Sequence, residues 1–121
     1  MIVAGFGFRA EAGLVSLQAA LALAQQGKPA VTLLATARDK VAALAPLAEA
    51  LGLPMRGLSP QELSSVPTLT RSAASMIARV TGSVAEASAL SAAGAGARLL
   101  GPRHVSPDRM VTCAIAEGSL P

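Results

Sequence analysis

Short apolar runs alternate with helix-like stretches along the first part of this chain. Residues 2–6 form a continuous apolar run, and between residues 11 and 26 apolar side chains recur every three or four positions. Gly27, with Pro29 soon after it, is typical of the end of a helix. Residues 31–34 form a second apolar run. The pattern predicts two parallel strands joined by a helix in a right-handed crossover.

The middle of the chain predicts a third strand between two short helices. Pro46 disfavours one unbroken helix after the second strand. We therefore expect a loop or single turn first, and then a helix over about residues 45–51 that Gly52 ends. Residues 53–58 predict a short strand. Residues 59–62 (Ser-Pro-Gln-Glu) follow with the capping serine, first-turn proline and acidic third residue of a helix start.

The last part of the chain predicts a long loop, a helix and two further strands. Residues 64–75 are rich in serine and threonine, which is typical of a surface loop. Residues 83–86 (Ser-Val-Ala-Glu) repeat the capping pattern and open a helix that Gly94 ends. Residues 98–100 and 110–116 predict two strands. Because the polar loop between them is short, these strands should be antiparallel neighbours.

The order of these elements predicts the fold class. At 121 residues the chain is long enough to bury one core, and we expect a single domain over residues 1–121. Strands that alternate with helices pack as layers. We predict an α/β domain of three layers, in which a mixed, mostly parallel five-stranded sheet is flanked by helices.

Composition excludes several classes of function. The chain has two Phe and neither Trp nor Tyr, so it lacks the aromatic rings on which single-stranded nucleic acids stack. The net charge of +3 comes without a basic run, and we expect no nucleic-acid partner. No apolar stretch approaches the length of a membrane span, and the N-terminus lacks a signal-like pattern. We therefore expect a cytoplasmic protein with no membrane partner.

Cysteine and histidine are too few to form the usual reactive or metal sites. Cys113 is the only cysteine and lies within an apolar run, which favours a buried structural thiol over a nucleophile. A single cysteine excludes an internal disulfide. One cysteine and one histidine, His104, do not supply the ligands of a structural zinc site. We expect neither a metal nor a cofactor.

A glycine-rich segment, residues 5–9 (Gly-Phe-Gly-Phe-Arg), overlaps the end of the first predicted strand and continues beyond it. A strand, a glycine turn and a helix form the arrangement that directs free backbone N–H groups at an anion. The alternative is a tight turn without a ligand, in which glycine adopts backbone angles that other residues avoid. Gly5, Gly7 and Ala10 also match the dinucleotide fingerprint G-x-G-x-x-A. No acidic residue ends the second strand to hold a ribose, although Arg38 could accept a 2′-phosphate.

Polar segments that follow the predicted strands should meet at the carboxyl edge of the sheet, where open α/β sheets bind ligands. They carry hydrogen-bond donors and positive charge, which favours an anionic ligand. Arginine outnumbers lysine along the chain, and its guanidinium group pairs with carboxylates through two parallel hydrogen bonds. The candidate ligand-binding residues are Gly5, Gly7, Arg9, Thr36, Arg38, Lys40, Thr81 and Ser83.

The same edge offers few groups for acid–base catalysis. Glu86 and His104 are the candidates, and each has a simpler interpretation. Glu86 fits the capping pattern of its helix, and His104 fits a solvated loop. The absence of a carboxylate pair favours binding of an anion over its transformation.

Several of these residues recur in order in one known family. The first strand runs into G-x-G-x-R, an Ala-Thr pair follows the second strand, Ser-Val-Ala-Glu-Ala opens a helix, and Val-Thr-x-Ala-Ile-Ala closes the domain. In these motifs the chain resembles the CobE family of cobalamin biosynthesis, also found as the C-terminal domain of CbiG, over essentially its whole length. The matching residues are Gly5, Gly7 and Arg9; Ala35, Thr36 and Lys40; Ser83 to Ala87; and Val111 to Ala116.

The chain departs from the family after the second glycine. Family members often carry Cys-Arg there, whereas this chain has Phe8-Arg9, so no role for a thiol can be carried over. The segment between Thr36 and Lys40 also lacks the acidic character of many members.

The resemblance implies a cytoplasmic role in building the corrin ring, with a precorrin or corrinoid intermediate as partner. The acetate and propionate carboxylates of such molecules suit an edge that carries arginine. In multidomain CbiG the implied activity is opening of a precorrin δ-lactone with release of a two-carbon fragment. Two alternatives therefore stay open for this chain. One is a lactone hydrolase that activates water with Glu86 or His104, and the other is a docking subunit for a pathway methyltransferase.

Overall fold

The computed structural model describes residues 1–64, 82–94 and 96–118, and the predicted loop beyond Ser64 lies outside this range. The elements in chain order are β1 (Ile2–Phe8), α1 (Leu14–Gln25), β2 (Leu33–Ala37), the 3₁₀ helix η1 (Arg38–Lys40), α2 (Val41–Leu51), β3 (Met55–Leu58), α3 (Pro60–Ser64), α5 (Gly82–Ala93), β4 (Arg98–Leu99), β5 (His104–Val105) and β6 (Val111–Glu117).

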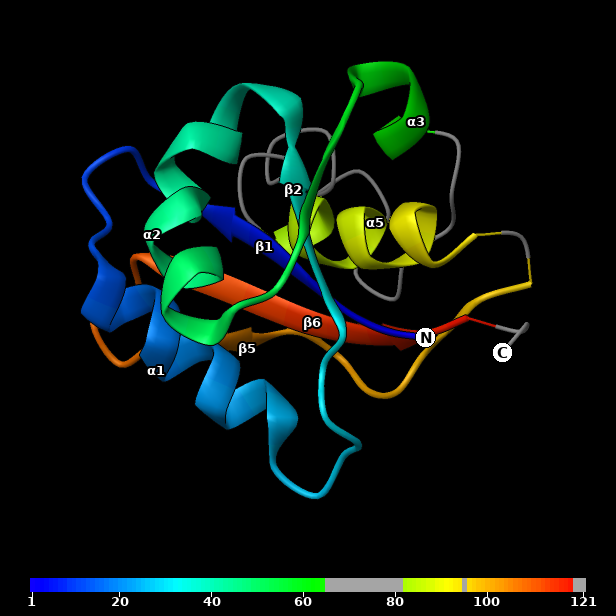
Figure 1. The fold of residues 1–121 in the computed structure, drawn as a ribbon, viewed down its shortest axis with the longest axis horizontal. Coiled ribbons are helices and arrows are strands. Elements are labelled where there is room, and N and C mark those ends of the chain that lie inside the picture. Colours follow the sequence, from blue (N-terminus) through cyan, green and yellow to red (C-terminus); the bar gives the residue numbers. More distant parts are fainter. Residues whose placement is uncertain (65–81, 95, 119–121) are drawn as a thin grey trace.

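One mixed sheet runs through the middle of the molecule (Figure 1). Its strand order is β3–β2–β1–β6–β4, and β5 also pairs with β6. The strands β1, β2 and β3 are parallel, whereas β6 is antiparallel to β1, β4 and β5. The predicted α/β class, the parallel start and the antiparallel pairing of the last strand are confirmed. The sheet has one strand more than predicted, because β5 lies within the expected loop.

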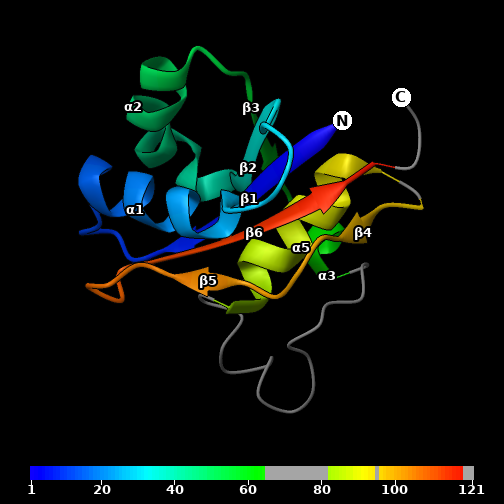
Figure 2. The same ribbon diagram turned by 90° about the horizontal axis from the view of Figure 1, so that it is seen from below.

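Helices cover both faces of this sheet, as the two views show (Figures 1 and 2). The helices α1 and α2 lie on one face, and α3 and α5 lie on the other. Residues of β1 alternate between the faces, as expected for a strand buried on both sides. Its even-numbered residues join the core with α1 and α2, whereas Val3 packs with Ala92 of α5. The three-layer prediction is confirmed.

The thiol of Cys113 lies in the core that α1 and α2 cover. It is fully buried, and this burial raises the pKa of the thiol, since the thiolate would lose its hydration. The prediction of a buried cysteine is confirmed, and its raised pKa suits a structural role rather than a nucleophile.

The central strand β1 continues further than the sequence predicts. It runs through Gly7 to Phe8, and all of its residues are buried. The glycine turn predicted over these residues is wrong, because the strand pairs with β2 as far as Phe6 and with β6 as far as Phe8. The chain turns only after Phe8. Helix α1 consequently begins at Leu14 rather than at Glu11.

Gly5 is required by the close approach of α5 to β1. A Cβ atom on Gly5 would lie 2.1 Å from the carbonyl oxygen of Ala85 and 2.5 Å from the backbone nitrogen of Ala89. These are backbone atoms, which cannot move aside as the end of a flexible side chain can. Glycine therefore lets the helix lie directly on the strand, a recognised use of glycine inside strands.

Helix α2 begins at Val41 rather than near residue 45, and Pro46 lies inside it. Proline removes one backbone donor, so the carbonyl oxygen of Ala42 loses its helical partner. Both residues are exposed, and water can hydrogen-bond that carbonyl group in place of the missing donor. Gly52 ends the helix as predicted, with a left-handed φ of 68°.

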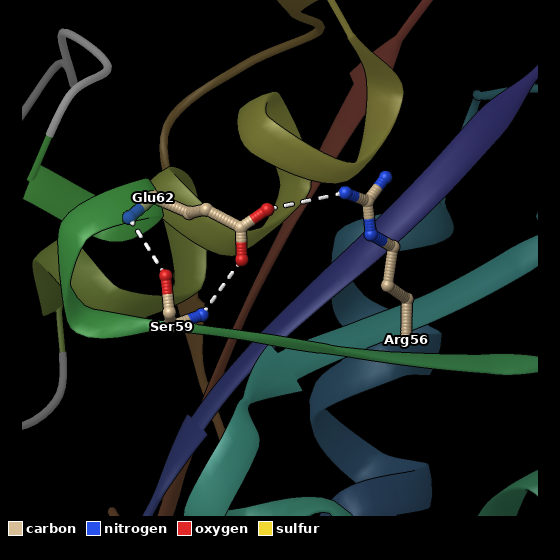
Figure 3. A network of polar contacts seen from close by, with 3 residues as sticks. All are labelled: Arg56, Ser59 and Glu62. Carbon is tan, nitrogen blue, oxygen red and sulfur yellow. Dashed lines mark hydrogen bonds and ion pairs between the residues drawn. The ribbon is translucent and has the colours of Figure 1, made fainter.

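The capping box at the start of α3 is confirmed (Figure 3). The backbone N–H of Ser59 donates to Glu62 Oε1 at 2.8 Å, and the backbone N–H of Glu62 donates to Ser59 Oγ at 3.1 Å. Arg56 also forms an ion pair with Glu62 at 3.2 Å. The hydrogen bond from the Ser59 backbone is the largest of the effects that lower the pKa of Glu62.

The turn between β5 and β6 is built around Asp108. One carboxylate oxygen accepts hydrogen bonds from the Ser106 hydroxyl at 2.5 Å and from the Met110 backbone N–H at 3.1 Å. The other accepts a hydrogen bond from the hydroxyl of Ser16 in α1. The Ser106 hydroxyl is the largest of the causes that lower the pKa of Asp108, followed by the Ser16 hydroxyl. This carboxylate therefore ties the turn to the first turn of α1.

Replacing Gly5 with alanine should destabilise the fold. The added methyl group meets backbone atoms of α5, and overpacking of this kind costs about 1–3 kcal/mol of unfolding free energy. Gly101→Ala is the matched control, because its Cβ would lie 3.7 Å from Lys28 Cε, which is ordinary contact. Chemical denaturation measures both variants. Equal stability of Gly5→Ala and the wild type would contradict the close packing described here.

The Asp108 carboxylate should stabilise the fold in a pH-dependent way. Its pKa is lowered in the folded state, so the stabilisation is present at neutral pH and is lost below about pH 4, as the carboxylate protonates. Asp108→Asn should lower the thermal midpoint at pH 7, and the difference from the wild type should shrink on acidification. Glu11→Gln, at an exposed acid outside the turn, should change the midpoint at pH 7 little. A difference that grows on acidification would contradict the expectation.

Candidate functional site

The carboxyl ends of β1 and β2 bring three of the predicted basic residues to one edge of the sheet. Arg9 directly follows β1, and Arg38 and Lys40 form the ends of η1, which directly follows β2. These strands are parallel neighbours, so the segments after them leave the sheet on the same side. The Lys40 ammonium lies 5.5 Å from the centre of the Phe8 ring, a cation–π contact that joins η1 to the end of β1.

The arginines at this edge differ from Arg56 and Arg98 in their partners. Arg9 and Arg38 are exposed, and neither forms an ion pair with another residue that the structure describes. By contrast, Arg56 pairs with Glu62 and Arg98 pairs with Glu117. Asp39, which lies between Arg38 and Lys40 in η1, is exposed. The guanidinium groups of Arg9 and Arg38 are therefore available to an anion from solution.

Three of the candidate residues are buried and contribute to the fold. Gly5 and Gly7 lie inside β1, and both pair with residues of β6. They therefore do not form a phosphate-binding turn. The dinucleotide interpretation is not supported for the same reason. Thr36 is fully buried, and its hydroxyl donates to the carbonyl oxygen of Phe6 at 2.9 Å. We assign Gly5 and Thr36 to packing and hydrogen bonding between the elements.

Two candidates near the start of α5 stay predictions. Ser83 belongs to the first turn of this helix. Its side chain lies outside the described part of the structure, and so does Thr81 as a whole. The ligand contacts predicted for both residues, and the capping box predicted at Ser83, therefore stay predictions. Gly94 ends α5 as predicted, with φ of 97°.

The two catalytic candidates occupy structural positions. Glu86 is fully buried in α5, and its Oε2 accepts a hydrogen bond from the backbone N–H of Arg103 at 3.3 Å. This contact holds the segment before β5 against α5. His104 is half-buried and pairs with Cys113 as the first residue of β5, so its predicted place in a solvated loop is wrong. A two-residue strand is too short to show a period in the sequence.

Sequence reasoning missed one segment that borders this edge. The backbone N–H of Arg9 donates to the carbonyl oxygen of Met110 at 3.1 Å, so the β5–β6 turn adjoins the end of β1. Serine, proline and aspartate at residues 106–108 are typical of a tight turn, which is the signal that could have located it.

No three His, Cys, Asp or Glu side chains within residues 1–64, 82–94 and 96–118 gather in a way that could hold a metal ion. In the same ranges, no helix is long and apolar enough to cross a membrane.

Comparison with known proteins identifies relatives over almost the entire chain. Residues 2–116 match the family described as cobalamin synthesis G C-terminus. A solved cobalamin biosynthesis protein, chiG of Agrobacterium tumefaciens str. C58, is 38% identical, with a TM-score of 0.76 over 98% of this chain and 99% of the other. CobE, a protein from the cobalamin (vitamin B12) biosynthetic pathway, is 32% identical, with a TM-score of 0.79 over 96% of this chain and 89% of the other.

A more distant solved structure shares the fold. A cobalamin biosynthesis protein G homologue from Sulfolobus solfataricus is 18% identical, with a TM-score of 0.76, and the match covers 98% of this chain and 37% of the other. Among curated proteins, no sequence matches this chain. The family match and the two structures that are 38% and 32% identical confirm the family to which the sequence motifs pointed. The chain therefore belongs to the cobalamin synthesis G C-terminus family and is a cobalamin biosynthesis protein of the CbiG/CobE type.

Proposed function

We propose that this protein binds a precorrin or corrinoid intermediate at the carboxyl ends of β1 and β2. The observation that carries the proposal is the basic edge formed by Arg9, Arg38 and Lys40, whose two arginines are exposed and make no ion pair within the described residues. Guanidinium groups bind carboxylates through paired, charge-assisted hydrogen bonds. Intermediates of corrin synthesis carry carboxylates around a ring, and family membership supports such a ligand.

The basic edge adjoins apolar surface that would suit the ring itself. Leu14 and Val15 open α1 after the loop that contains Arg9, and these residues are 37% and 79% exposed. Large apolar side chains with such exposure at a ligand edge favour contact with an apolar group of the ligand. A macrocycle that carries carboxylates on its rim combines both kinds of surface.

Binding is better supported than catalysis. Glu86 accepts a hydrogen bond from the Arg103 backbone, and His104 in β5 pairs with Cys113, so the contacts observed for both residues are structural. Lactone opening and docking on a methyltransferase remain predictions from the sequence without an observation that favours them here. A single domain and a cytoplasmic location are part of the present proposal.

A titration with two related corrinoids tests the proposal. Cobyrinic acid carries its side chains as free carboxylates, and cobinamide carries them as amides on the same ring. We expect the visible spectrum to report micromolar binding of cobyrinic acid and much weaker binding of cobinamide. Arg9→Ala should weaken the binding of cobyrinic acid about tenfold, as expected for a lost charge-assisted pair.

The matched control is Arg98→Ala. It removes the same side chain at the opposite end of the sheet, where Arg98 pairs with Glu117, and it should bind cobyrinic acid as the wild type does. Two results would contradict the proposal. One is no binding of cobyrinic acid at micromolar concentration, and the other is unchanged affinity in Arg9→Ala.

A further inference from the structure

The β5–β6 turn contains an arginine whose backbone conformation is uncommon for this residue type. Arg109 has φ of 63°, and it is the one non-glycine residue with positive φ among those that the structure describes. Glycine and asparagine adopt this left-handed conformation at lower cost than arginine does. Residues held in such conformations concentrate at functional sites, so the Arg109 side chain is a candidate for function.

Hydrogen bonds fix the backbone that carries this arginine. The N–H of Arg109 donates to the Ser106 carbonyl at 2.8 Å, and the N–H of Ser106 donates to the Val111 carbonyl at 2.8 Å. The Ser106 hydroxyl accepts the Val111 N–H at 3.1 Å. Asp108 adds the contacts to Ser106, Met110 and Ser16 described above. A turn fixed in this way loses little conformational freedom when its side chain binds a ligand.

The turn places Arg109 next to the residue on which the proposed site depends. Arg9 donates its backbone N–H to Met110, the residue directly after Arg109, at 3.1 Å. Figures 1 and 2 show the β5–β6 turn beside the loop that follows β1. Arg109 is exposed, and within the described residues it forms no ion pair, as is also true of Arg9. The neighbouring acid, Asp108, instead directs its carboxylate to Ser106, Met110 and Ser16.

We infer that Arg109 is a further carboxylate-binding residue, which extends the ligand site from the end of β1 onto the β5–β6 turn. The inference rests on the proposed function. Two arginines on adjoining but separately fixed segments bind two carboxylates at a set spacing. This arrangement favours a ligand whose carboxylates are held apart on a rigid ring over a flexible chain with the same groups.

The test compares affinity and stability in variants of Arg109. Arg109→Gly removes the guanidinium group and relieves the left-handed backbone, so its thermal midpoint should equal or exceed that of the wild type. Its dissociation constant for cobyrinic acid should nevertheless rise about tenfold. Asparagine also adopts this conformation, so Arg109→Asn should behave like Arg109→Gly. This second variant controls for loosening of the turn by glycine. Arg98→Ala again serves as the control for loss of one positive charge.

Three outcomes would overturn the inference. If Arg9→Ala weakens binding but both Arg109 variants bind as tightly as the wild type, Arg109 is not a ligand residue and the proposed function stands. If the wild type does not bind cobyrinic acid, both the inference and the proposed function are wrong. If both Arg109 variants lose thermal stability together with affinity, the role of Arg109 is structural.

Discussion

The direct packing of α5 on β1 at Gly5 is the contact on which the rest of this structure depends. A Cβ at that position would lie 2.1 Å from the Ala85 carbonyl oxygen, so the helix can approach the central strand only where no side chain intervenes. The close approach of α5 to β1 has a second effect at the next residue of the helix. Glu86, buried one residue after Ala85, reaches the backbone N–H of Arg103 and fixes the segment that leads to β5. One small residue thus lets α5 close this face of the sheet at its centre.

A central strand held in this way fixes the site at its end. Because β1 lies between β2 and β6, the residue after it borders two further segments that are distant in the sequence. Lys40 contacts the ring of Phe8 from η1, and Met110 accepts the Arg9 N–H from the β5–β6 turn. Basic residues from three segments therefore lie at one end of the sheet, and none of them makes an ion pair within the described residues. Exposed guanidinium groups that make no ion pair can each bind a carboxylate through two parallel hydrogen bonds, and this is why the edge favours a polycarboxylate.

The sequence predicted the parts of the fold that short-range patterns determine. Periodicity located the first helix, Ser59 and Glu62 formed the predicted capping box, and Gly52 ended its helix. It could not decide the role of Gly5, because glycine suits a turn and also suits a strand beneath a helix, and the deciding contact comes from α5. Arg9, Arg38 and Lys40 were found because they follow predicted strands. Arg109 was not, because its position depends on the pairing of β6 with β1, which no local pattern reveals.

The central claim is that a carboxylate-bearing corrinoid binds at the end of β1, and amide chemical shifts test it most directly. Isotope-labelled protein titrated with cobyrinic acid should show its largest shift changes at Arg9, at Arg38 to Lys40 and at the β5–β6 turn. Changes should be small at β4, which pairs with β6 at the opposite end of the sheet. Largest changes at β4, or no changes at the end of β1 with saturating ligand, would contradict the account.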